Sequence, residues 1–226
     1  MHFTKFSKID YISRLDHLFS ESFKDDKIKL AVFKFGYTEQ RLEEGRVLFN
    51  ELNRLVQEHS LAMKNKADIN HQKQQLYRYV NKQYMKYLKI ARIAFDSHIE
   101  AHDSLMLDGV REKTFGKWFA QVSVFCNNLL AIKSYWPYLE SYGIKVSQIE
   151  ELKRQLSQLE LLSEKAIQMS GNVKMLTVKK NEQTLNVQSW ISDYIKIARI
   201  ALEDAPTILK KLGLGVNQPA TKKKSD

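Results

Sequence analysis

The stretch Tyr87-Leu88-Lys89-Ile90-Ala91-Arg92-Ile93-Ala94-Phe95-Asp96 decides the fold prediction, because it returns later in the chain. Residues 194–203 read Tyr-Ile-Lys-Ile-Ala-Arg-Ile-Ala-Leu-Glu, and the offset between the two segments is 107 residues (87 + 107 = 194). We call these segments the first box and the second box. A fixed internal offset is typical of a duplicated structural unit, so the boxes predict a chain of two similar halves.

The same offset relates apolar positions outside the boxes. Residues 8–24 carry apolar side chains at the i, i+3, i+4, i+7 spacing of one helical face. Adding 107 to these positions finds apolar residues again, in the series Trp118, Phe119, Val122, Phe125, Cys126 and Leu130. Gly143 likewise corresponds to Gly36, and a glycine there is typical of the end of a helix.

These patterns predict an all-α protein of two tandem, similar helical bundles in a pseudo-two-fold arrangement. Each bundle is expected to hold an opening helix, a short helix, a long heptad helix and a box helix. The predicted bounds are residues 1–100 for the first bundle, 101–113 for a connector, 114–216 for the second bundle and 217–226 for a disordered basic tail.

Two polar segments predict interruptions in the long helices. Residues 65–70 contain Asp68 and predict a turn ahead of a box helix at about residues 72–98. In the second half, Ser170-Gly171-Asn172 predicts a break, because glycine and asparagine are poor helix formers.

The boxes are built for packing. At 100° per residue, a tyrosine and two alanines fall on one face of each box helix, and most of the circumference is apolar. These residues are Tyr87, Ala91 and Ala94 in the first box and Tyr194, Ala198 and Ala201 in the second. Small residues on a face let another helix approach closely. We predict that the box helices are the most buried elements, with the hypothesis that their alanine faces pack on each other.

Composition places the chain among globular proteins that need no covalent staple. Apolar residues make up 43% of the 226 residues and aromatic residues 11%, and the single cysteine, Cys126, lies in an apolar run. One cysteine excludes a disulfide framework and favours a reducing compartment. The N-terminal residues lack the apolar segment of a signal peptide, and no run reaches the roughly 18 apolar residues that span a membrane. We therefore expect a cytoplasmic protein with no membrane partner.

A positively charged segment is the strongest functional lead in a chain of net charge +10. Residues 64–92 contain eight Lys or Arg and one acid, Asp68. On a helix, five of these cations share one side, and we call them the basic stripe: Arg78, Lys82, Lys86, Lys89 and Arg92. The flanking aromatic residues are Tyr77, Tyr79 and Tyr84. Aromatic rings beside cations are typical of single-stranded nucleic-acid binding, whereas the other interpretation is a solvated charged face.

The basic stripe is not part of the duplicated pattern, because the second half has Leu185, Ser189 and Asp193 at the first three positions. A separate candidate site is the pair His98 and His102, four residues apart among acidic residues. That spacing can place two imidazoles on one metal ion. The other interpretation is a surface pair near a helix end.

Signatures of catalysis are absent from the sequence. It contains no Walker loop, no Gly-x-Gly-x-x-Gly after a strand and no Gly-x-Ser-x-Gly. We therefore expect a protein that is not an enzyme and has no cofactor. The prediction is a helical scaffold or protein-interaction module that binds a protein partner or itself. Nucleic-acid binding through the basic stripe is the first alternative, and a metal- or ligand-binding bundle is the second.

Overall fold

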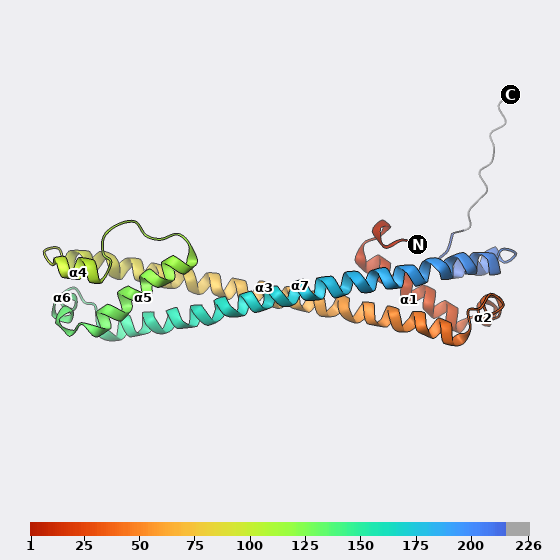
Figure 1. Cartoon of the computed structure of the whole chain (residues 1–226), viewed down its shortest axis with the longest axis horizontal. Helices are drawn as coiled ribbons and strands as arrows, with labels where there is room; N and C mark the ends of the chain where they lie inside the picture. Colours follow the sequence, from red (N-terminus) through yellow and green to blue (C-terminus); the bar gives the residue numbers. More distant parts are fainter. Residues whose placement is uncertain (216–226) are drawn as a thin grey trace, which may run out of the picture. The chain divides into compact units, whose positions relative to one another are not determined.

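The computed structural model describes residues 1–215, apart from the side chain of Phe3, and these residues form helices without a β-strand (Figure 1). The helices are α1 (Lys8–Lys24), α2 (Asp26–Phe33), α3 (Glu39–Ala94), α4 (Ile99–Ser104), α5 (Phe115–Ala131), α6 (Trp136–Glu140), α7 (Val146–Ala201) and α8 (Pro206–Lys211), with 3-10 turns η1 (Phe3–Lys5) and η2 (Lys133–Tyr135). The all-α prediction is confirmed. The predicted tail at residues 217–226 lies outside the described residues.

Local signals separate the short helices from the long ones. Gly36 and Gly143 adopt φ angles of 82° and 75°, a left-handed conformation that glycine enters without a Cβ clash. They follow α2 and α6, as the sequence predicts. At the start of α3, the hydroxyl of Thr38 accepts a hydrogen bond from the backbone N–H of Arg41 at 3.2 Å, and satisfies one of the free N–H groups there.

The two long helices are uninterrupted, and both predicted interruptions are wrong. Helices α3 and α7 each contain 56 residues and run through residues 65–70 and 170–172, respectively. A single glycine costs a helix only about 1 kcal/mol, and asparagine or aspartate less. Buried residues next to each segment offset that cost: Ala62 precedes residues 65–70 and shares a cluster with Val173, while Ala166 and Val173 flank residues 170–172. Within residues 1–215, no helix has the length and apolar character needed to cross a bilayer.

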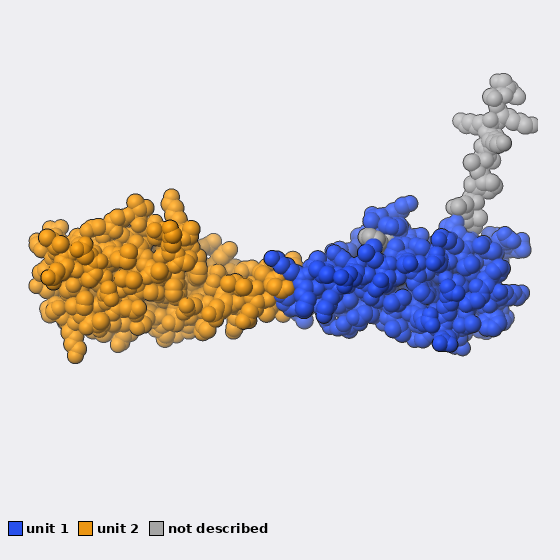
Figure 2. All heavy atoms as spheres, in the orientation of Figure 1, with its two compact units in different colours: residues 1–62, 172–226 blue, residues 63–171 orange. Residues whose placement is uncertain are grey.

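The chain divides into two compact units, which Figure 2 colours separately. Unit 1 combines residues 1–62 with the described residues from 172 onward, and unit 2 is residues 63–171. Each unit therefore takes residues from both halves of the sequence, and its bounds differ from the bundles expected at residues 1–100 and 114–216. The physical reason is that α3 and α7 each contribute one segment to unit 1 and one to unit 2.

The core of unit 2 joins the first box to the beginning of α7. Tyr87 and Ala91 lie in one buried cluster with Ile149 and Leu152, and α5 adds Trp118 to it. The apolar heptad positions of the second half thus cover the box of the first half. This exchange buries the apolar faces of both segments in one core.

The core of unit 1 repeats this exchange with the roles of the halves reversed. Tyr194 and Ala198 of the second box share a buried cluster with Leu42 and Phe49 of α3. Ala198 and Ala91 are both fully buried, as predicted, but they belong to separate cores. Each alanine face packs on a heptad segment of its own unit instead of on the other box, contrary to the hypothesis. The remaining box alanines, Ala94 and Ala201, are half-buried.

Helix boundaries recur at the offset that relates the boxes. Helix α1 begins at residue 8 and α5 at 115 (8 + 107 = 115). Helix α3 spans 39–94 and α7 spans 146–201, again 107 residues later at both ends. Helix α4 begins at residue 99 and α8 at 206, which is the same difference.

Candidate functional site

Four of the five residues of the basic stripe point to solvent. Arg78, Lys82, Lys86 and Lys89 are exposed on α3, and none of them has an ion-pair partner among residues 1–215. The fifth, Arg92, is half-buried, and its Nε–H donates to the backbone carbonyl of Leu107 at 2.6 Å. Arg92 therefore anchors the connector after α4, and the free basic surface consists of the other four side chains.

The tyrosines beside the basic stripe are mostly used inside unit 2. Tyr84 is fully buried, and its hydroxyl accepts a hydrogen bond from Arg111 at 2.8 Å. The ring of Tyr77 packs edge-on against Trp118 at 4.5 Å between centroids. Only Tyr79, 48% exposed, offers an open ring face for a base.

The two histidines of the candidate metal site are engaged by different neighbours. The ring of His98 packs edge-on against Tyr138, with centroids 4.5 Å apart, while Nδ1 of His102 lies 2.8 Å from a carboxylate oxygen of Asp108. Among residues 1–215, no three His, Cys, Asp or Glu side chains gather where a metal ion could bind. The arrangement favours structural roles for both histidines.

The tyrosine of each box is buried in the core of its unit. The hydroxyl of Tyr194 lies 2.5 Å from that of Ser22, which donates onward to the carbonyl of Leu18 at 2.7 Å. Burial raises the pKa of Tyr194 to about 12, because the phenolate would lose its hydration. Tyr87 is also buried in the core of unit 2. Both boxes thus act as packing elements in the structure.

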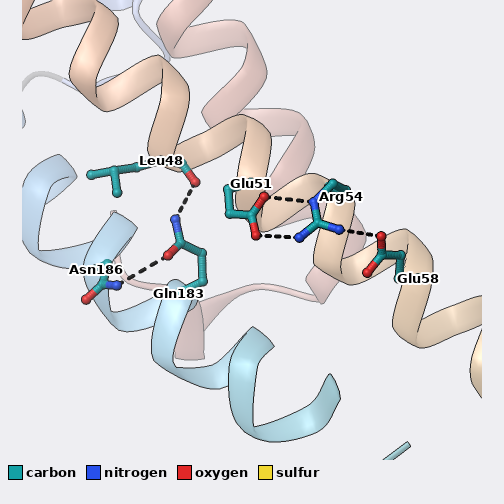
Figure 3. A network of polar contacts seen from close by, with 6 residues as sticks. All are labelled: Leu48, Glu51, Arg54, Glu58, Gln183 and Asn186. Carbon is teal, nitrogen blue, oxygen red and sulfur yellow. Dashed lines mark hydrogen bonds and ion pairs between the residues drawn. The ribbon is translucent and has the colours of Figure 1, made fainter. Parts of the chain in front are cut away.

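Polar contacts fix α7 against α3 in unit 1 (Figure 3). The side-chain amide of Gln183 on α7 donates to the backbone carbonyl of Leu48 on α3 at 2.8 Å. On the adjacent face of α3, Arg54 bonds to Glu51 at 2.6 and 2.8 Å and also to Glu58. The guanidinium holds the pKa of Glu51 below its ordinary value. Arg54 therefore links two carboxylates that each lie about one helical turn from it along α3.

A solvent-facing apolar surface on α2 is the feature that the sequence analysis missed. It consists of Leu30 and Phe33 on α2 and Phe35 in the turn after the helix, which are 67%, 60% and 45% exposed, and we call it the α2 surface. Leu30 and Phe33 lie three residues apart, so they are neighbours on one helix face. Their partners on the opposite face, Ile28 and Val32, are fully buried. The alternation of apolar residues on both faces of a short helix is the signal that could have indicated this surface.

No protein-family model, curated protein or solved structure matches the chain. The chemistry and exposure of these side chains are therefore the basis for assigning a function.

Proposed function

We propose that this chain is a non-enzymatic helical interaction module that self-associates through the α2 surface. The observation that carries the proposal is the exposure of Leu30, Phe33 and Phe35 at the C-terminal end of α2 in unit 1. Contiguous exposed apolar side chains rimmed by charge are typical of protein contacts. Sedimentation velocity of the purified chain, with substitutions in this surface, tests the proposal.

The charges along α2 favour a second copy of the chain as the partner. Asp26 is the first residue of α2 and Lys34 follows its last. When two α2 helices pair antiparallel about a two-fold axis, Asp26 of one copy lies beside Lys34 of the other, so the surface complements itself. A contact between such short helices buries less than the roughly 1,200 Å² of a stable complex, so the expected dimer is weak and concentration-dependent.

The corresponding surface of unit 2 is a natural contrast. Pro137 and Glu140 stand at the positions that Leu30 and Phe33 occupy (30 + 107 = 137; 33 + 107 = 140). We propose that the two halves descend from one duplicated helical unit, supported by the boxes and by helix boundaries at one offset. The third position keeps an exposed aromatic residue, Tyr142 in place of Phe35, so the contrast between the units lies at Leu30 and Phe33. The pseudo-two-fold relation and the cytoplasmic location stay predictions.

Nucleic-acid binding is the second candidate function, favoured by the four exposed and unpaired cations of the basic stripe. Four phosphate contacts on a single strand correspond to a slope of about −3 in log affinity against log salt. Fluorescence anisotropy with a labelled oligonucleotide tests it, comparing Lys82→Glu/Lys86→Glu with the control Lys165→Glu in the same unit. Salt-independent binding, or equal loss in the control, would exclude the basic stripe as the site.

A further inference from the structure

Unit 1 contains an apolar cavity between α1, α3 and α7. Its volume is about 370 Å³, within the range of small-molecule sites. Most of its exposed lining is apolar surface, with Ile12 from α1, Leu52 and Val56 from α3 and Leu185 from α7; the other lining residues are Tyr11, Asn181, Thr184 and two lysines. A cavity of this composition accepts a flexible hydrocarbon body better than a polar one.

Two lysines line the cavity with no carboxylate beside them. Lys180 is only 6% exposed, and no acidic side chain of residues 1–215 pairs with it or with Lys8. Burial, together with contact from Lys8, lowers the pKa of Lys180. A buried cation is costly unless an anion accompanies it.

The surroundings add positive potential to this place. Lys8 is the first residue of α1, whose N-terminus is capped by Ser7 and holds Asp10 in the same turn. The pKa of His59 is lowered by burial and then by the charges of Lys180 and Lys8. Three basic side chains from three helices therefore share one electrostatic neighbourhood at an apolar cavity.

The lysine at the corresponding position of unit 2 has partners within the unit. Lys73 stands at the position of Lys180 (73 + 107 = 180). Its Nζ donates to the hydroxyl of Ser163 at 2.8 Å and lies 4.4 Å from the ring centroid of Phe115, the counterpart of Lys8. In unit 2, Ser163 and Phe115 are therefore partners of Lys73, whereas in unit 1 the position of Phe115 is occupied by a second cation, Lys8.

We propose that the cavity of unit 1 binds a medium-chain carboxylate, whose carboxylate group pairs with Lys180 and Lys8 and whose chain lies against Ile12, Val56 and Leu185. The carboxylate supplies the missing counter-charge, and the hydrocarbon chain fills the apolar volume. The cavity and the α2 surface share no residue, so this site does not depend on the proposed self-association.

Decanoate, below its micelle concentration, is the probe that tests the site. Isothermal titration measures its affinity, and the methyl NMR signals of Ile12 and Val56 locate it. Decanol, with the same chain and no charge, and decyltrimethylammonium, with the opposite charge, are the ligand controls. We expect decanoate to shift both methyl signals and to bind about tenfold or more tightly than either control.

Variants of the lysines complete the test. Lys180→Met is expected to weaken decanoate binding about tenfold or more, while Lys180→Arg keeps it and Lys73→Met leaves it unchanged. Circular dichroism confirms that each variant is folded. Equal affinity for decanol, full decanoate affinity in Lys180→Met, or no decanoate binding up to about 1 mM overturns the proposal.

Discussion

The indole ring of Trp190 occupies the space beside Gly45 in which any other residue would place its Cβ atom. A Cβ built on Gly45 would lie 2.5 Å from the indole Cζ2 atom, far inside van der Waals contact. The counterparts in unit 2 are Leu152 and Gln83 (45 + 107 = 152; 83 + 107 = 190). The larger side chain thus comes from α7 in both units: Trp190, four residues before the second box, in unit 1 and Leu152 in unit 2.

Replacing Gly45 with alanine is expected to lower the free energy of unfolding by up to about 2 kcal/mol. Alanine improves helix propensity by about 1 kcal/mol, but overpacking against a ring that cannot move costs about 1–3 kcal/mol. Urea denaturation followed by circular dichroism measures the change. The double variant Gly45→Leu/Trp190→Gln recreates the pair of unit 2 and should be more stable than Gly45→Leu alone. A stabilising Gly45→Ala would show that the indole does not pack there.

Gly171 provides the opposite case within a long helix. It lies inside α7, and nothing lies within 4 Å of a Cβ placed there. Gly171→Ala should therefore raise the free energy of unfolding by about 0.5–1 kcal/mol, and Gly171→Pro should lower it by about 3 kcal/mol or more. The same denaturation experiment applies. No response to either substitution would indicate that the chain is not helical at residues 170–172.

The hydroxyl contact between Tyr194 and Ser22 makes a prediction about stability and pH. Tyr194→Phe should cost about 1 kcal/mol, whereas Tyr87→Phe, which removes the counterpart hydroxyl, should change stability by less than about 0.5 kcal/mol. The pKa of Tyr194 is raised from 10.0 to about 12 in the folded protein. The unfolded chain therefore loses this proton first, and stability falls as pH rises from 10 towards 12.

That loss of stability should be smaller in Tyr194→Phe than in the parent chain, because the variant has no phenol to ionise at this position. Chemical denaturation of the variant and of the parent chain at several pH values above 9 measures this difference. An identical decline in both proteins would mean that Tyr194 is not protected by burial.

Removing the positive charge of Lys180 should change the pKa of His59 and the free energy of unfolding. In Lys180→Met, the pKa of His59 should rise, because one of the positive charges that lower it has gone. The free energy of unfolding should increase by about 1 kcal/mol or more, since a buried unpaired cation is replaced by an apolar chain. NMR titration of His59 and urea denaturation measure the two effects. The neighbouring exposed Lys179→Met is the matched control, and a His59 pKa that does not rise would contradict the assignment.

Sequence patterns predicted helices well where a single face is apolar. The spacing of Tyr11, Leu15 and Leu18 in α1 indicates the buried face correctly, and Ala91 and Ala198 are buried in both boxes as predicted. Each of these signals is local, because it depends on residues three or four apart. Local periodicity therefore carries much of the helix content and of the core.

The features that escaped prediction depend on non-local packing. The residues near Gly171 in sequence do not indicate that Val173 and Leu176 of α7 are buried against α3, so the sequence alone predicts a break at this weak helix former. The exchange of heptad segments between the halves is also invisible, because periodicity identifies an apolar face but not its partner. Lys180 sits beside an exposed Lys179, and only tertiary packing distinguishes the buried lysine from the solvated one.

Four of the five cations of the basic stripe are exposed, whereas Arg92 is half-buried and two of the three aromatic neighbours are engaged inside unit 2. Tyr77 and Tyr84 flank the basic stripe in helical projection, but helix α5 and Arg111 engage them. A helical wheel shows which side a residue lies on, and it does not show what covers that side.

Sedimentation velocity tests the central claim, self-association through the α2 surface, most directly. The parent chain, examined over about two decades of concentration around a micromolar Kd, should shift from monomer to dimer. Phe33→Glu, which installs the residue of the unit 2 counterpart, should weaken the dimer about tenfold or more, while Val110→Glu, at an 86% exposed position of unit 2, should not. Asp26→Lys and Lys34→Glu should each weaken it, and their combination should restore it. A parent chain that stays monomeric throughout, or a dimer indifferent to Phe33→Glu, would contradict the account.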